Sequence, residues 1–177
     1  MCVWRCRYLC KRTRVRVFRS LVLPVLLYSC ETWTVTGELR RRLNSFGTMS
    51  LRRILGYRWH DNMSVDLVLI REAGMRQVTS IVRERQLRLY GHVARLPAED
   101  PAHRILYCWD PGGWTMPSGQ PHASWLRQVE SYLKDSGIAG LASASVMARR
   151  RPNEYRRKLD AATRCSDVWP HTLPCWN

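Results

Sequence analysis

Residues 77–96, QVTSIVRERQLRLYGHVARL, decide the fold class of this chain. Apolar side chains recur there at helical spacing, which predicts a helix whose buried face contains Val78, Ile81, Val82, Leu89, Val93 and Leu96. Arg85 and His92 fall at the edge of that face. A core histidine bonded to the backbone is a better interpretation of His92 than a metal ligand or a general base. Pro97 is expected to end the helix, because proline is excluded from helix interiors.

Other helices are predicted on both sides of this one, so the chain is expected to be mainly α. The expected fold is a small helical bundle of about five to seven helices. The remaining helices are predicted over residues 5–28 with a kink at Pro24, and over 37–55, 64–73, 122–135 and 153–162, with a weaker one over 137–147. Two apolar stripes are expected to be buried. The helix over 37–55 contributes Leu39, Leu43 and Phe46, and the helix over 122–135 contributes Trp125, Val129 and Leu133.

Composition divides the chain into four expected segments. These are a basic helical domain over residues 1–100, a loop or linker over 101–121, a C-terminal helical segment over 122–165 and a disordered tail over 166–177. The stretch 110–120, DPGGWTMPSGQ, is rich in glycine and proline and is predicted to be a mobile loop. The tail contains Pro170 and Pro174 and is predicted to be frayed.

The chain is strongly basic, with a net charge of +15 and a pI near 10.3. Of its 29 basic residues, 26 are arginine, whose planar guanidinium matches phosphate and stacks on bases. The surplus is +11 over residues 1–60, zero over 61–148 and +4 over 149–177. A polyanionic partner, nucleic acid above all, is therefore expected at the two ends. Biased codon usage in the source genome is the alternative explanation for the arginine excess.

The seven cysteines are an odd number without a C-x₂-C pair, so neither a disulfide framework nor a zinc knuckle is indicated. Cys2, Cys6 and Cys10 would form one stripe on a helix, and we interpret them as small buried residues rather than ligands of a soft metal. Reduced thiols indicate an intracellular setting, nuclear or cytoplasmic. The apolar run 21–28 is broken by Pro24 and is far too short to span a membrane, so no membrane partner is expected.

The basic residues most suited to nucleic acid lie before residue 60. In the amino-terminal set almost no acid offsets the cations, and Trp4 and Tyr8 add aromatic planes on which bases could stack. Arg88 and Arg95 share a side of the helix over 77–96, although local ion pairs are an equally good interpretation there. The candidate contacts are Arg5, Arg7, Lys11, Arg12, Arg14, Arg16, Arg19, Arg40, Arg41, Arg52, Arg53, Arg88 and Arg95.

Five short motifs occur in order along the chain. They are the P-x-L-L-Y-x-C-E-T-W box at 24–33, R-R-I-L at 52–55, W-x-D-x-x-S at 59–64, R-x-R-x-L-R-x-x-G-H-V-x-R at 83–95 and P-x-x-x-W at 121–125. In this order they resemble the region that follows the palm in reverse transcriptases of LINE-type (non-LTR) retrotransposons, over residues 5–172. Ser29 stands where that family usually has glycine. The resemblance also departs before Trp125, where an arginine-rich loop is replaced by Gly113, Ser118 and Gln120.

The resemblance implies a thumb and post-palm tail that clamps a template–primer duplex, RNA or an RNA–DNA hybrid, by its backbone without reading sequence. It makes an intact reverse transcriptase a further candidate partner. The palm of such an enzyme holds two Mg²⁺ ions through paired aspartates, and this chain has no Asp-Asp pair. We therefore expect a tail without its catalytic domain: no enzyme activity, no catalytic residues, no metal site and no cofactor.

Two other interpretations remain open at this point. One is a helical interaction module whose basic ends bind any polyanion or a protein partner. The other is a decayed reading frame with no selected function, in which an apolar patch left exposed on the first helix would promote aggregation. A preference for an RNA–DNA hybrid over heparin would distinguish the first interpretation from these two.

Overall fold

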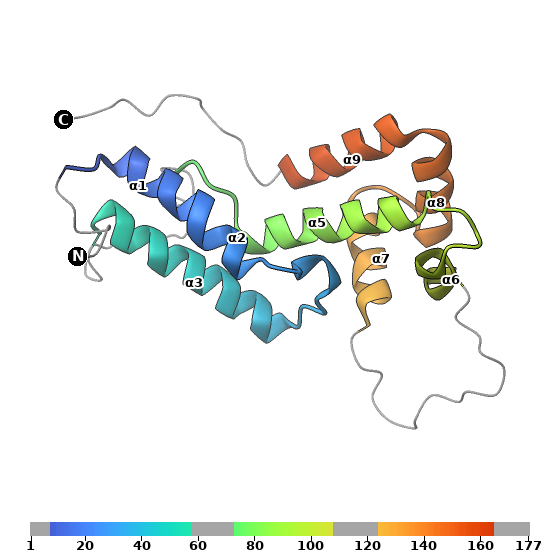
Figure 1. Ribbon diagram of the computed structural model, residues 1–177, viewed down its shortest axis with the longest axis horizontal. Coiled ribbons are helices and arrows are strands. Elements are labelled where there is room, and N and C mark those ends of the chain that lie inside the picture. Colours follow the sequence, from blue (N-terminus) through green and yellow to red (C-terminus); the bar gives the residue numbers. More distant parts are fainter. Residues whose placement is uncertain (1–7, 58–72, 108–123, 165–177) are drawn as a thin grey trace, which may run out of the picture. The chain divides into compact units, whose positions relative to one another are not determined.

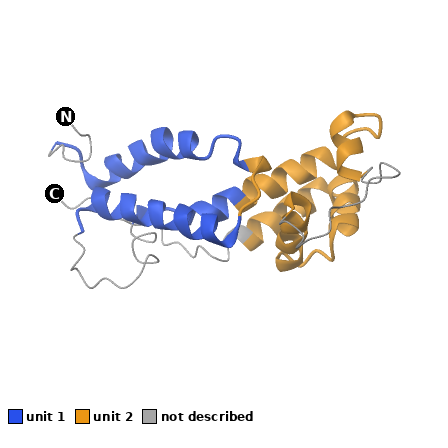
Figure 2. Ribbon diagram, turned by 90° about the horizontal axis from the view of Figure 1, so that it is seen from below, with its two compact units in different colours: residues 1–30, 36–82, 164–177 blue, residues 31–35, 83–163 orange. Residues whose placement is uncertain are grey.

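The computed structural model describes residues 8–57, 73–107 and 124–164, and every element within these ranges is helical (Figure 1). The prediction of a small all-helical fold is therefore confirmed. The chain divides into two compact units (Figure 2). Unit 1 comprises residues 1–30, 36–82 and 164–177, and unit 2 comprises residues 31–35 and 83–163. The division between the units falls after Val82, inside a helix.

Unit 1 opens with a helical segment made of α1 (Lys11–Val17), a π-helical turn η2 (Phe18–Val22) and α2 (Leu23–Leu26). The π-helical turn lies directly before Pro24, the position of the predicted kink, because proline lacks the N–H that an unbroken α-helix requires there. Helix α1 begins at Lys11, because the backbone at Cys10 is extended, so residues 8–10 of the helix predicted over 5–28 are not helical. Cys10 is exposed, which corrects the interpretation that it is buried.

The long helix α3 (Gly37–Leu55) has the predicted bounds and contacts α1. It begins where the Thr36 hydroxyl accepts a hydrogen bond from the Leu39 N–H at 3.2 Å, and it ends at Gly56, whose left-handed backbone has φ 86°. Its buried face is Leu43, Gly47, Thr48, Leu51, Ile54 and Leu55. Phe46, predicted to be buried, is 42% exposed. The face is rotated because Gly47 lies against Val78, where an added Cβ would stand 2.8 Å from Val78 Cγ2.

Helix α5 (Val78–Val93) begins in unit 1 and continues in unit 2 (Figures 1 and 2). Its buried positions, with Ala94 just beyond its end, are Val78, Val82, Glu84, Gln86, Leu87, Tyr90, Gly91 and Ala94. The predicted face was therefore right for Val78 and Val82 and wrong for the later turns. His92 is exposed, which corrects its interpretation as a core histidine. Polar Gln86 is buried because its side-chain amide donates to the Trp33 carbonyl at 2.7 Å.

Unit 2 packs the rest of α5 with α7 (Trp125–Asp135), α8 (Leu141–Arg150) and α9 (Pro152–Arg164) around one apolar core. Val129 and Leu133 are buried in it as predicted, whereas Trp125 is half-buried and its indole N–H donates to the Glu31 carbonyl at 2.7 Å. Two tyrosines bridge elements through their hydroxyls: Tyr90 donates to the Leu141 carbonyl at 2.7 Å and Tyr155 to the Leu87 carbonyl at 2.9 Å. Burial raises the pKa of both phenols.

The expected linker over 101–121 begins with a helix, α6 (Pro101–Tyr107), which buries none of its residues. An Asp-Pro pair starts it, because the Asp100 carboxylate accepts from the Ala102 N–H at 2.8 Å. A short 3-10 turn, η3 (Cys30–Thr32), completes the described elements.

Four predictions lie outside the described residues. They are the helix over 64–73 apart from its last residue, the mobile loop over 110–120, the tail over 166–177 and the positions of Cys2 and Cys6. In the described ranges, no helix is long and apolar enough to cross a membrane.

Candidate nucleic-acid interface

The segment from α1 to η2 has a basic side and an apolar side. Val15 and Phe18 are buried, whereas Lys11, Arg12, Arg16 and Arg19 are exposed. Arg12, Arg16 and Arg19 follow each other at intervals of four and three residues, so they share one side of the segment. Lys11 Nζ lies 5.8 Å from the centre of the Tyr57 ring. The arrangement places several cations in a row about one helical turn apart, which suits a run of phosphates.

Two arginines of this predicted set donate hydrogen bonds to backbone carbonyls. Arg14 is only partly exposed, and its Nε donates to the Leu9 carbonyl at 3.0 Å, so it ties the chain before α1 to the helix. Arg19 Nη1 donates to the Gly74 carbonyl at 3.5 Å, a long contact that leaves most of the guanidinium available. Arg5 and Arg7 lie outside the described residues.

Helix α3 carries the second predicted set on its outward surface. Arg40, Arg41 and Arg53 are exposed and Arg52 is half-buried. Arg42, beside them, is paired with Glu38 one turn earlier at 2.5 Å. Glu38 is the only acidic side chain in the part of unit 1 that the structure describes. The described surface of unit 1 is therefore strongly positive, with little local charge to balance it.

Several of the described arginines of unit 1 have no carboxylate partner. In the ranges described, Arg12, Arg16, Arg41 and Arg53 form no ion pair with another side chain. An exposed arginine without a carboxylate partner keeps its full attraction for an external anion.

Most basic residues along α5 are engaged with carboxylates of unit 2. Arg83 lies 3.4 Å from Asp135, stacks over the Tyr132 ring at 4.9 Å from its centre and donates to the Tyr132 carbonyl at 2.9 Å, so it fastens α5 to α7. Arg88, a predicted contact, reaches Glu84 at 2.5 Å and Asp160 at 3.8 Å. Its charge is balanced by two acids, as the ion-pair interpretation anticipated. Arg95 is exposed.

A third group of cations lies at the junction of α8 and α9 and was not among the predicted contacts. Arg150, Arg156 and Arg157 are exposed there, and Arg151 pairs with Glu154 at 3.2 Å. Arg149 donates through Nε to the Ala94 carbonyl at 2.6 Å and contacts His103. The run RRRPNEYRRK over 149–158 is the sequence signal that would have identified this surface.

An exposed apolar stripe follows the basic side of the first segment. Leu21, Val25 and Tyr28 are 64%, 78% and 79% exposed, and they are separated by four and three residues. Leu21 lies in η2, Val25 in α2 and Tyr28 in the turn that follows α2, so three large apolar side chains that are close in sequence are exposed to water.

The chain is similar in sequence to a transposon-derived protein. The chain is 32% identical over 127 residues to a Caenorhabditis elegans protein described as uncharacterized and transposon-derived. The matched stretch covers 70% of this chain and 45% of the relative, so the chain spans less than half of that protein's length. No protein-family model matches the chain, and no solved structure matches it significantly.

Proposed function

We propose that the chain is the nucleic-acid-gripping part of a LINE-type retrotransposon reverse transcriptase, a thumb-like clamp on the backbone of a template–primer duplex. The observation that carries the proposal is the charge of unit 1. Several arginines are exposed on α1 and α3, and Glu38 is the one acidic side chain in the part of the unit that the structure describes. Contacts to phosphate fix position and supply affinity without reading bases. Arginine suits this role because its planar fork of donors matches phosphate.

Two further observations support the assignment to this class of element. The five ordered motifs resemble the post-palm region of such enzymes, and the Caenorhabditis elegans relative is described as transposon-derived. The proposal assigns no phosphoryl transfer to this chain, since two adjacent aspartates, which would hold the metal ions of a polymerase, do not occur in its sequence.

The test is fluorescence anisotropy with an RNA–DNA hybrid, single-stranded RNA and heparin, each titrated across a salt series. The proposal expects the hybrid to bind most tightly and to stay bound above physiological salt, because a clamp fits the geometry of the duplex as well as its charge. Equal affinity for all three ligands that disappears by physiological salt would contradict it.

A protein-interaction module is the second candidate, and the exposed stripe of Leu21, Val25 and Tyr28 favours it. Apolar patches of this kind commonly mark contacts with another protein. Under this alternative the basic surface is generic, and heparin should bind at least as tightly as the hybrid. The same salt series therefore separates the two candidates.

A further inference from the structure

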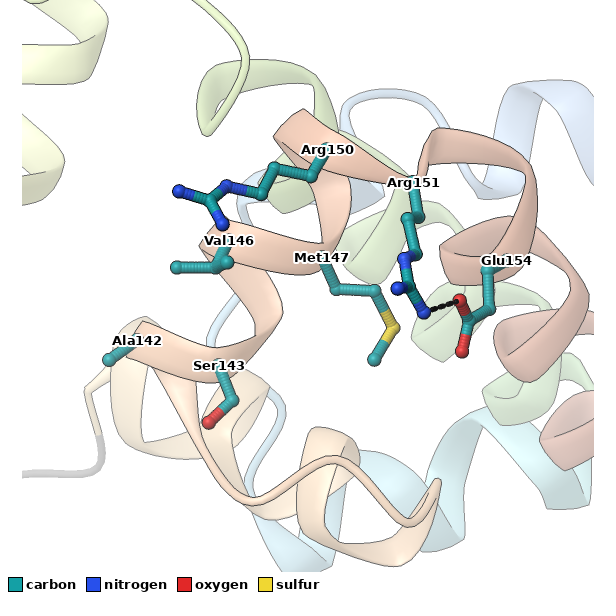
Figure 3. Close-up of a pocket in the computed structure, with 7 residues that line it drawn as sticks. All are labelled: Ala142, Ser143, Val146, Met147, Arg150, Arg151 and Glu154. Carbon is teal, nitrogen blue, oxygen red and sulfur yellow. Dashed lines mark hydrogen bonds and ion pairs between the residues drawn. The ribbon is translucent and has the colours of Figure 1, made fainter.

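Residues of helix α8 and of the start of α9 line an open groove of about 520 Å³ in unit 2 (Figure 3). Ala142, Val146 and Met147 form its apolar part, and Ser143, Arg150, Arg151 and Glu154 form its polar part. Figure 3 shows the Arg151 and Glu154 side chains directed toward each other across the turn between the two helices, with Met147 beside them. Val146 is 53% exposed, so its side chain is available to a ligand.

The two parts of the groove suit two parts of one ligand. Val146 and the Met147 thioether offer a polarisable apolar surface, of the kind on which a flat ring can lie. Arg150 is exposed and, among the residues described, forms no ion pair or hydrogen bond. The Arg151–Glu154 pair, 3.2 Å apart, presents guanidinium donors and a carboxylate acceptor next to that surface.

We infer that this groove binds one unpaired nucleotide at the single-stranded end of the bound nucleic acid, which rests on the proposed function. The base lies on Val146 and Met147, its polar edge meets the Arg151–Glu154 pair and its phosphate meets Arg150. A thioether can contact the ring of any base, so the contact adds affinity without adding specificity.

The charges around the groove favour a nucleotide over an acidic peptide. Residues 149–158 contain six basic residues and one acid, so the surroundings attract an anion. The one acid, Glu154, lies inside the groove, where it repels a carboxylate side chain but accepts a hydrogen bond from the amino group of a base. A phosphate linked to a base satisfies both conditions.

The experiment compares a blunt RNA–DNA hybrid with the same hybrid carrying a four-nucleotide single-stranded extension, by anisotropy with the full chain. The extension should tighten binding about fivefold, which is the scale of one favourable contact between a thioether and an aromatic ring. Val146→Glu and Arg150→Gln should each remove most of that gain, measured for each variant as the ratio of its affinities for the extended and the blunt hybrid. Arg104→Gln, which removes an equally exposed charge from α6, should leave the gain intact.

Each other outcome overturns a specific part of the account. If the blunt hybrid binds but the extension adds nothing, or if Val146→Glu and Arg150→Gln keep the gain, the nucleotide site is wrong and the clamp stands. If a glutamate-rich peptide abolishes the gain at the concentration at which an oligonucleotide does, the groove is a peptide site. If neither hybrid binds, both proposals fail. Circular dichroism of each variant establishes that its helices are intact.

Discussion

At the scale of single residues, the glycine in the G-H-V motif has a packing explanation. A Cβ built at Gly91 would overlap the ring of Tyr155, which is buried and held by its hydrogen bond to the Leu87 carbonyl. The ring therefore cannot move away without losing that bond. Sequence reasoning could mark Gly91 as part of a motif, but it could not know that α9 places a tyrosine against it 64 residues later.

Gly91→Ala should accordingly destabilise the chain, by about 1–3 kcal/mol, because it overpacks the contact with Tyr155. Alanine would otherwise be favoured in a helix by up to about 1 kcal/mol, so the sign of the change is informative. Urea denaturation measures it. Gly37→Ala is the matched control, since a Cβ at Gly37 meets nothing within 4 Å, and it should be neutral or stabilising. A stabilising effect at both positions would show that Tyr155 does not pack against Gly91.

Other single residues mark the limit of sequence reasoning about the site. The exposed positions of Arg12, Arg16 and Arg53 agree with the sequence pattern. The ion pair of Arg88 with Glu84, one turn earlier on the same helix, agrees with the local interpretation made from the sequence. The contact of Arg88 with Asp160 could not be anticipated, because it depends on where α9 folds. Charge density and local ion pairs were readable from the sequence, and the pairing of charges far apart in the chain was not.

At the scale of elements, the best-predicted helix is the one with both ends encoded locally. α3 begins at a threonine cap and ends at a glycine with positive φ, and its bounds match the prediction. α6 was missed because it buries nothing and so has no apolar period to read. The buried face of α5 was only partly predicted, because its two ends belong to different units and its polar Gln86 is buried by a backbone partner.

The cap of α3 can be tested directly. Thr36→Ala removes the acceptor for the Leu39 N–H and should lower the free energy of unfolding by about 1 kcal/mol. Ser45→Ala removes a hydroxyl from the exposed surface of the same helix and should change stability by less than about 0.5 kcal/mol. Thermal unfolding followed by circular dichroism compares them. Equal effects would mean that the Thr36 hydroxyl does not cap the helix.

At the scale of the whole molecule, the two units differ in how many of their cations are paired with carboxylates, and therefore in how strongly they attract an external anion. The described surface of unit 1 combines unpaired arginines with one acid, whereas in unit 2 Arg83, Arg85, Arg88, Lys134 and Arg151 each have a carboxylate within 4 Å. The sequence placed the basic surplus before residue 60, and the structure adds that Arg12, Arg16, Arg41 and Arg53 form no ion pair within the described ranges. We therefore propose that α1 and α3 make the main contacts with the nucleic-acid backbone.

The salt dependence of hybrid binding, measured for two charge-matched double variants, tests that claim most directly. Arg12→Gln with Arg16→Gln removes two exposed cations from α1, and Arg104→Gln with Arg127→Gln removes two from α6 and α7. The first pair should reduce the slope of log K against log salt by roughly 1.5, at about 0.7–0.9 for each lost phosphate contact, while the second leaves it nearly unchanged. Equal reductions in both would mean that binding follows total charge, and would contradict a grip located on α1.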